Sequence, residues 1–311
     1  MYDIITIGSA TVDVFLKSSR FPLSKQEVGG KIEIDQFFIS SGGGGTNTAA
    51  GFARLGLKTA CIARFGDDFF GQLIIKDLEK ESFDRKYLIE KKEDNTDYST
   101  VLVNPDGSRT ILVYRGKTRI DEEVFPWDAL RETKWLYMAS IEGNVDLLLV
   151  VVKKATEFGV KVVLNPGSSE LEQKEKLLSV FPRLEALVLN KEEADSFGLK
   201  EGFGQGPNIL VITNGRQGVK LFSSSENLYA EALRIDTVDE TGAGDAFSVG
   251  FVGGLVKGLS CAESLKLGLA NGAAVVSQFG GKTGLLYERD VEVILRQKNK
   301  IEHIFTTGDL A

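Results

Sequence analysis

Hydrophobic residues along the chain gather into six short runs rich in β-branched side chains, and longer amphipathic stretches separate these runs. The runs are Ile4 to Gly8, Thr59 to Gly66, Trp135 to Ser140, Val160 to Pro166, Ala186 to Asn190 and Ile209 to Thr213. Continuous apolar runs of this length are typical of parallel strands buried on both faces. Their alternation with helical segments predicts an α/β fold, a doubly wound and mostly parallel sheet flanked by helices.

Two segments break this alternation. Gly29 to Ser40 and Tyr98 to Gly116 alternate apolar and polar side chains with a period of two, and NPDG at residues 104–107 supplies a turn within the second. They predict antiparallel strands of a small β lid, from about residues 14–40 and 97–116, inserted in a single domain of residues 1–311. An edge extension of the main sheet is the alternative, but large insertions on α/β cores usually cover the ligand crevice.

Composition and charge narrow the function. The 311 residues are 42% hydrophobic and 26% charged, which suits one large globular domain. A net charge of -7 and a pI near 5.1 argue against a general affinity for nucleic acid or an anionic membrane. We therefore expect no nucleic-acid or membrane partner, and any phosphate site must be local.

Residues that other enzyme classes require are scarce. The first residues, MYDIITIG, lack the basic and long apolar parts of a signal peptide, so we expect a cytoplasmic protein. Two cysteines are too few for a disulfide framework, and the single histidine, His303, cannot supply a multi-histidine metal site. The chemistry must rest on carboxylates, glycines and backbone amides.

A glycine-rich turn leads directly into an apolar helical stretch in VDETGAGDAF, residues 238–247. Gly242, Ala243 and Gly244 bring successive backbone N–H groups to a helix N-terminus, where unpaired donors and the helix dipole favour an anion. Asp245 lies in that first turn and is a candidate general base. The alternative is that Asp245 is only a favourable helix-start residue.

A second glycine-rich segment, SSGGGGTNTAAGFARLG, covers residues 40–56. Four consecutive glycines let the backbone approach a ligand closely, and Asn47 adds a donor and an acceptor in the first helical turn. Neither the P-loop pattern nor a Rossmann GxGxxG is present. A flexible connection between lid and core would have the same composition.

Together the two glycine motifs resemble the N-terminal and C-terminal signatures of the ribokinase (PfkB) family of carbohydrate and nucleoside kinases. Four smaller matches follow in family order, namely Asp13 after the first strand, RFGDDFFG at residues 64–71, Asn190 with Glu193, and TNGRQG at residues 213–218. The resemblance covers essentially the whole chain. It implies a ribokinase-like fold with a lid.

The resemblance also implies roles in phosphoryl transfer. Asp245 would take the proton from the acceptor hydroxyl as it attacks the γ-phosphoryl of ATP, and the backbone of Gly242, Ala243 and Gly244 would form the anion hole. Asn190 and Glu193 would organise Mg2+ and phosphate mainly through water, in keeping with the reluctance of Mg2+ to lose its waters. A helix cap formed by the same two residues is the alternative, and both readings are compatible.

The remaining site residues are likewise implied by resemblance. Asp13, Gly43, Asn47 and Glu142 would bind the acceptor, although Asp13 as a solvated strand-end residue and Glu142 as a surface residue are the alternatives. The nucleotide would contact Thr213, Gly215, Gly218 and Asn271, of which Asn271 is alternatively a packing residue. Asp239 and Thr241 stand where potassium-activated members place ligands of K+.

Two departures leave the acceptor open. Glu240 replaces the small hydroxyl residue usual in the C-terminal signature, which puts potassium dependence in doubt, and Gly44 stands where ribokinase itself has lysine. The expected function is therefore transfer of the γ-phosphoryl of ATP to a hydroxyl of a small sugar. The alternatives are a nucleoside kinase, with Phe15, Phe37 and Phe38 as candidate contacts of a base, and a non-catalytic nucleotide-binding protein. By the same resemblance we expect a homodimer formed through the lid.

Overall fold

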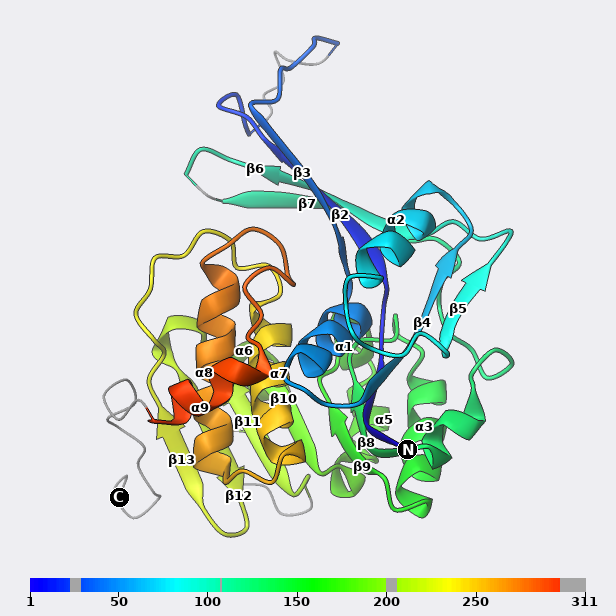
Figure 1. The fold of residues 1–311 in the computed structure, drawn as a ribbon, viewed down its shortest axis with the longest axis vertical. Coiled ribbons are helices and arrows are strands. Elements are labelled where there is room, and N and C mark those ends of the chain that lie inside the picture. The colour runs from blue at the N-terminus through cyan, green and yellow to red at the C-terminus, as the bar shows by residue number, and fades with distance from the viewer. Residues whose placement is uncertain (23–28, 107, 200–205, 297–311) are drawn as a thin grey trace.

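A nine-stranded sheet with helices on both faces forms the main body of the structure (Figure 1). The computed structural model describes residues 1–22, 29–106, 108–199 and 206–296. The sheet has the order β13-β12-β11-β10-β9-β8-β1-β4-β5. Its strands are β1 (Tyr2–Ile7), β4 (Thr59–Gly66), β5 (Leu88–Lys91), β8 (Thr133–Met138), β9 (Lys161–Leu164), β10 (Ala186–Asn190), β11 (Ile209–Thr213), β12 (Val219–Ser223) and β13 (Asn227–Ala230).

All six apolar runs coincide with parallel strands of this sheet, so the predicted fold class is confirmed. The sequence pattern did not reveal β5, β12 and β13. At one edge of the sheet, β12 pairs antiparallel with β11, and β13 pairs antiparallel with β12. Their shorter runs alternate buried and more exposed positions, because an edge hairpin is not covered on both faces as the central strands are.

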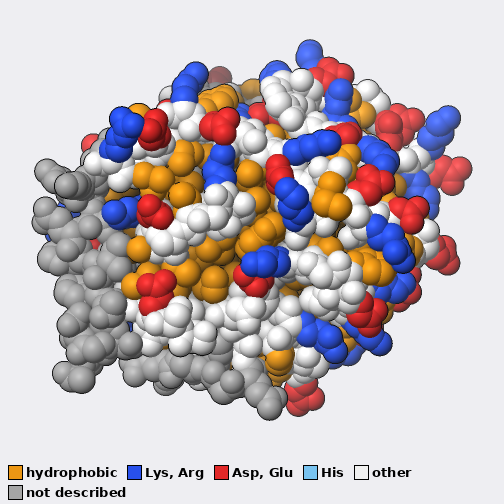
Figure 2. Space-filling model, turned by 60° about the horizontal axis from the view of Figure 1, so that its bottom comes forward, with side chains coloured by type: hydrophobic (Ala, Val, Ile, Leu, Met, Phe, Trp, Pro, Cys, Tyr) orange, Lys and Arg blue, Asp and Glu red, His pale blue; other side chains and the backbone are white. Residues whose placement is uncertain are grey.

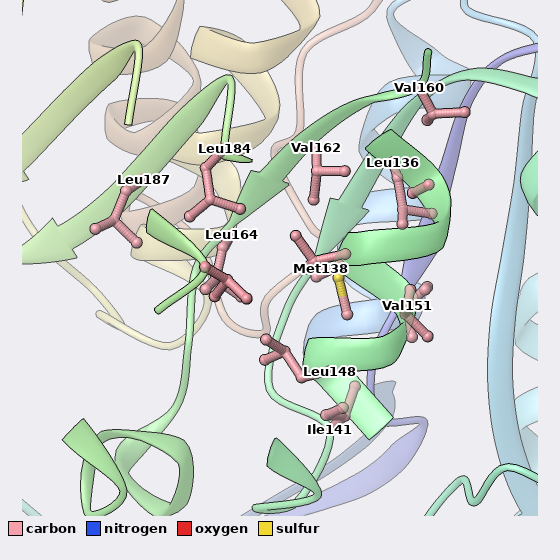
Figure 3. Packing of buried hydrophobic residues seen from close by; sticks show 14 of the residues in the cluster. Leu136, Met138, Ile141, Leu148, Val151, Val160, Val162, Leu164, Leu184 and Leu187 are labelled. Atoms are coloured by element: carbon pink, nitrogen blue, oxygen red, sulfur yellow. The ribbon is translucent and has the colours of Figure 1, made fainter. Parts of the chain in front are cut away.

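Nine α-helices are present in the described ranges. They are α1 (Gly44–Arg54), α2 (Phe69–Leu78), α3 (Val145–Glu157), α4 (Ser168–Leu171), α5 (Lys174–Leu178), α6 (Lys191–Ser196), α7 (Ala243–Val256), α8 (Cys261–Val276) and α9 (Glu288–Arg296). On one face of the sheet, Leu148 and Val151 of α3 pack against Met138 of β8 and Val162 of β9 (Figure 3). On the other face, Phe52 of α1 and Phe251 of α7 join a second buried cluster.

A separate four-stranded sheet stands away from the main one, as predicted for the lid (Figure 1). Its order is β3 (Gln36–Gly42), β2 (Thr11–Lys17), β6 (Asp97–Val103) and β7 (Arg109–Tyr114). The β2–β3 and β6–β7 pairs are antiparallel, but β2 and β6 run parallel, which the sequence did not indicate. Residues 23–28 and 107 of the expected lid segments lie outside the described residues.

The strand register divides the lid side chains between two faces. Asp13 is paired with Ser40 and Ser99, and positions two residues apart share a face, so Phe15, Phe38 and Arg109 lie on the face of Asp13. The opposite face carries a second row of side chains: Leu16, Phe37, Tyr98, Leu102 and Leu112. The lid therefore has one face associated with Asp13 and one face turned away from it.

The surface shows no concentration of positive charge on the face drawn in Figure 2, where Lys and Arg side chains are interspersed with Asp and Glu. Among the residues that the structure describes, no helix combines the length and the apolar character that crossing a membrane requires. The cytoplasmic location stays a prediction.

Candidate active site

The glycine turn of the C-terminal motif forms the N-terminus of α7. Gly242 is the N-cap residue, with φ of 75°, in the left-handed region. A Cβ atom at this position would lie 2.5 Å from Cα of Gly281. Glycine is thus required both by the backbone conformation and by the close approach of the neighbouring chain. The backbone N–H of Ala243, the first residue of α7, donates to the Glu240 carbonyl at 3.2 Å. The start of a helix leaves further N–H groups without an intrahelical partner, as an anion site needs.

Asp245 lies in the first turn of α7 and is partly buried. Burial is the largest influence on this carboxyl and raises its pKa. Asn47 Nδ2 of α1 donates a hydrogen bond of 3.1 Å to Asp245 Oδ2 and opposes that rise. The negative charge of Asp13 raises the pKa further, and the ammonium group of Lys282 lowers it. A carboxylate with a raised pKa and a fixed orientation has the properties of a general base.

A cavity of about 290 Å³ opens in front of this turn. Its lining includes Gly242, Ala243, Gly244 and Asp245, together with residues at the carboxyl ends of two strands, Asn190 after β10 and Thr213 of β11. In open α/β sheets, ligands bind at the carboxyl ends of the strands. The structure thus brings the predicted anion hole, the predicted base and part of the predicted nucleotide site to one cavity.

Asn190 and Glu193 form a capping box at the start of α6. The Glu193 backbone N–H donates to Asn190 Oδ1 at 2.9 Å, and the Asn190 backbone N–H donates to Glu193 Oε2 at 2.8 Å. The cap therefore exists. Both residues also line the 290 Å³ cavity, and burial raises the pKa of Glu193. The capping role and a role toward a ligand are compatible, because each Glu193 oxygen accepts more than one hydrogen bond.

Asp13 and the first glycine segment meet at the base of the lid. A side chain on Gly42 would collide with the Asp13 carboxylate, so the two residues are in contact. Gly43 has φ of 96°, and a Cβ atom there would collide with the Ser9 carbonyl. Burial raises the pKa of Asp13, while a hydrogen bond from Ser99 lowers it. Asp13 is therefore a largely buried carboxylate rather than a solvated strand end.

Glu142 follows β8 in a left-handed conformation with φ of 60°, unusual for a residue with a side chain. Burial, followed by the charge of Asp97, raises its pKa to about 7. The two carboxyl groups share a hydrogen bond, and Arg115 and Thr118 are also near. Asp97 begins β6 opposite Thr11, two residues from Asp13. Glu142 thus belongs to a buried polar cluster at the lid base and is not a surface glutamate.

Asn271, expected to contact the nucleotide, packs between helices in this structure, in keeping with the alternative of a packing residue. Asn271 is completely buried, its Nδ2 donates to the Ala246 carbonyl at 2.6 Å, and its Oδ1 accepts from the Leu286 backbone N–H at 2.8 Å. The amide therefore joins α8 to α7 and to the following segment. Gly215 and Gly218 lie in the turn after β11, outside the lining of the 290 Å³ cavity.

Asp239 and Thr241, expected near potassium, are already engaged by a cationic side chain. Arg109 Nη1 donates to Asp239 Oδ1 and, at 2.7 Å, to Thr241 Oγ1. The side chains of Asp239 and Thr241 are thus used by the guanidinium, and this donor set does not fit a monovalent cation in addition.

Sequence reasoning missed three residues near the site. Arg109 contacts Asp239, Lys282 is buried with its Nζ donating to the Ser41 carbonyl at 2.8 Å, and Asn165 lines the 290 Å³ cavity. Burial lowers the pKa of Lys282, and nearby carboxylates, Asp77 first, oppose that effect. Lys282 could have been found from its position in the glycine-rich segment FGGKTG. Nothing in the sequence singles out Arg109 except its place on a predicted lid strand.

Comparison with known proteins agrees with this geometry. The model of the pfkB family carbohydrate kinases matches residues 1–286. The chain is 26% identical over 302 residues to a ribokinase of Bacillus subtilis, covering 95% of this chain and 100% of the relative. It is also 26% identical to an ATP-dependent 6-phosphofructokinase of Thermoanaerobacterium thermosaccharolyticum, covering 86% of each. Among solved structures, the nucleoside kinase of Methanocaldococcus jannaschii superposes with a TM-score of 0.80 at 22% identity, covering 95% of this chain and 98% of that one.

A doubly wound sheet with a glycine-rich helix N-terminus beside a carboxylate in its first turn is the architecture of a ribokinase-like kinase. The chain belongs to the pfkB family of carbohydrate kinases. It is an ATP-dependent kinase that acts on a sugar or a nucleoside, and the resemblance drawn from the glycine motifs is confirmed.

Proposed function

We propose that this protein transfers the γ-phosphoryl group of ATP to a hydroxyl of a small sugar, with Asp245 as general base. The observation that carries the proposal is the position of the Asp245 carboxylate, which lines the cavity and is held by Asn47 beside the N-terminus of α7. The carboxylate would accept the hydroxyl proton while the N–H groups of Gly242 to Gly244 stabilise charge on the transferring phosphoryl group.

The acceptor would lie between Asp245 and Asp13. Asp13 and Glu142 supply carboxyl oxygens at the lid base, and Gly43 leaves its backbone close to the same space. Carboxylates that accept two hydroxyl hydrogen bonds hold a polyol well. The full-length similarity to a ribokinase supports a sugar as the acceptor.

Magnesium would enter with the nucleotide. Glu193, Glu240 and Asp245 all line the 290 Å³ cavity. Mg2+ usually keeps several waters and is held by one or two carboxylates together with substrate phosphates, so this donor set fits. When bound, Mg2+ would neutralise phosphate charge, while Glu193 would hold its waters.

The test is ADP release with Mg2+ and ATP over pentoses, hexoses, their phosphates, sugar acids and nucleosides. We expect turnover with one class of sugar. If the wild type binds ATP but releases no more ADP than Asp245→Asn with any acceptor, a non-catalytic nucleotide-binding protein would be the better description.

Nucleoside phosphorylation is the second candidate, and the apolar side chains on the Asp13 face of the lid favour it. Phe15 and Phe38 have ring centroids 5.9 Å apart, and Ile111 and Val113 on the same face are exposed. Such a surface suits contact with a base. Turnover with nucleosides alone, with a nucleoside KM that Phe38→Ala raises and an ATP affinity that it leaves unchanged, would establish this candidate over the sugar kinase.

We also propose a homodimer formed through the lid. Strand β7 is the last strand of the lid sheet in the described chain, and Phe37 and Leu112 on the outward face are 64% and 55% exposed. An exposed apolar edge strand favours pairing with a second copy.

A further inference from the structure

A contact between the lid and the main body has no part in the function proposed above. Arg109, the first residue of β7, donates from Nη1 to Asp239 Oδ1 and Thr241 Oγ1, and its Nη2 lies 3.8 Å from Glu240 Oε2. Arg109 belongs to the lid face that carries Asp13. In Figure 1 the turn end of the β6–β7 hairpin lies above the yellow and orange segments, which contain these loop residues. The side chain therefore spans from the lid to the loop before α7.

Asp239 is a nearly buried carboxylate that organises this loop. Its Oδ1 accepts from the Thr241 backbone N–H at 3.0 Å, and its Oδ2 accepts from the Gly280 backbone N–H at 3.1 Å. Gly281, the next residue, packs against Gly242. Asp239 thus fixes both chain segments that shape the turn of the anion hole.

The partners of Asp239 differ in charge. The N–H groups of Thr241 and Gly280 and the hydroxyl of Thr241 are neutral, whereas Arg109 brings a full positive charge. A buried carboxylate is costly unless a cation or several donors compensate it. The guanidinium, 25% exposed, fulfils this need permanently and with fixed geometry, because arginine does not lose its proton.

We propose that the Arg109 guanidinium is the built-in cation of the Asp239 loop, and that it replaces a monovalent metal ion there. Its hydrogen bonds occupy Asp239 Oδ1 and Thr241 Oγ1, so these oxygens are not open to a metal ion. A second cation beside the guanidinium would also be repelled by its charge. Turnover is then independent of K+. The inference rests on the proposed function, because the anion hole that Arg109 supports belongs to that reaction.

The origin of the cation in the lid has a mechanistic consequence. A metal ion would hold the loop in every lid position, but Arg109 holds it only while β7 lies over the cleft. Arg109 is therefore a positioning residue that couples lid closure to the order of the Gly242 turn. It acts through Asp239 and Thr241 and touches no reacting atom.

The test compares wild type, Arg109→Ala and Lys17→Ala in K+ and in choline chloride at equal ionic strength. Lys17 is the matched control, because it lies in the same lid row as Val103 and Arg109. We expect wild type and Lys17→Ala to turn over equally in both salts. Arg109→Ala should lose about 10- to 100-fold in choline, the size of a small displacement of positioned groups. Potassium should restore most of that loss, because it enters the vacated site.

Thermal unfolding provides a readout that needs no substrate. Potassium should raise the Tm of Arg109→Ala relative to choline and leave the Tm of wild type and Lys17→Ala unchanged. If no acceptor supports turnover, the proposed function fails, while this Tm difference still decides the cation site.

Three results would overturn the inference: strong potassium activation of wild type, full turnover of Arg109→Ala in choline, or a folded but inactive Arg109→Ala that potassium neither activates nor stabilises. Arg109→Lys keeps the charge without the planar fork and should retain more activity in choline than Arg109→Ala.

Discussion

At the scale of single residues, the site depends on carboxyl groups whose pKa is raised by burial. Asp245, Asp13 and Glu142 share this property, and burial is the largest cause in each. Each is also held by a named partner, Asn47, Ser99 or Asp97. Asp13 is close enough to Asp245 to raise its pKa, and Asp97 does the same to Glu142.

Asp245→Asn should lower turnover by roughly 100-fold or more while ATP affinity is retained, because the base is lost and the backbone anion hole is not. The Tm should not fall, since the variant loses a buried carboxyl and keeps its shape. Turnover and ATP binding are measured on the same preparation. Asp146→Asn is the control, a first-turn aspartate of α3 on the surface. Wild-type turnover in Asp245→Asn would contradict the base assignment.

Glu142→Gln should change the pH dependence of stability. In the folded protein the pKa of Glu142 is about 7, against 4.5 ordinarily, so between these values the folded state binds more protons than the unfolded state. Its contribution to stability therefore decreases as pH rises from 4.5 to 7. Glutamine still donates to Asp97 but carries no charge, so at pH 8 it should stabilise the fold by on the order of 1–3 kcal/mol.

The measurement is Tm from pH 5 to pH 8 for wild type, Glu142→Gln and the exposed Glu175→Gln. The advantage of Glu142→Gln should grow with pH and that of Glu175→Gln should stay near zero. A Tm advantage of Glu142→Gln that shrinks as pH rises would mean that the folded protein stabilises the ionised form of Glu142.

At the scale of elements, the two glycines that flank α7 share a backbone conformation but differ in how closely other atoms surround them. Gly242 precedes the helix with φ of 75° against Gly281, and Gly258 follows it with φ of 79° and open space around it. Both glycines occupy the left-handed region, which costs an ordinary residue roughly 1–2 kcal/mol. Only Gly242 has neighbouring backbone within 3 Å of an added Cβ atom, and only Gly242 lies at the proposed anion hole.

Gly242→Ala should therefore lower Tm more than Gly258→Ala and also reduce turnover by about tenfold or more, since the N–H groups of the turn are displaced. Gly258→Ala should lower Tm modestly and keep turnover. Parallel melting and ADP-release measurements compare them. Equal effects on turnover would show that the turn is not part of the site.

At the scale of the whole molecule, the two faces of the lid sheet make different contacts. The face of Asp13 also carries Arg109, which reaches the α7 loop. At its base the other face packs on α2 through Val14, Ile39 and Tyr98. Toward its tip that face exposes Phe37 and Leu112.

Leu112→Asp should therefore weaken the proposed dimer, because a carboxylate would be buried in an apolar contact. Val113→Asp is the matched control, since Val113 is 53% exposed on the opposite lid face. Sedimentation at several concentrations should show monomer for Leu112→Asp and dimer for wild type and Val113→Asp. A monomeric wild type would exclude the lid dimer.

The sequence by itself determined the fold class and the glycine turn at the centre of the candidate site. Parallel strands buried on both faces require continuous apolar runs, and such runs can be read locally. The turn before α7 was equally readable, because left-handed conformation and exposed N–H groups depend on glycines adjacent in sequence. The cap formed by Asn190 and Glu193 could also be predicted, because its two hydrogen bonds join residues only three positions apart.

Tertiary structure alone decided which distant residues act together. Asn47 lies 198 residues from Asp245, and Arg109 lies 130 residues from Asp239. No local pattern encodes such pairs, because they depend on how the lid and the helices pack on the sheet. The same packing turned Asn271 into a clamp between α7 and α8, raised the pKa of Glu142, and brought an arginine to the place where the sequence had suggested potassium.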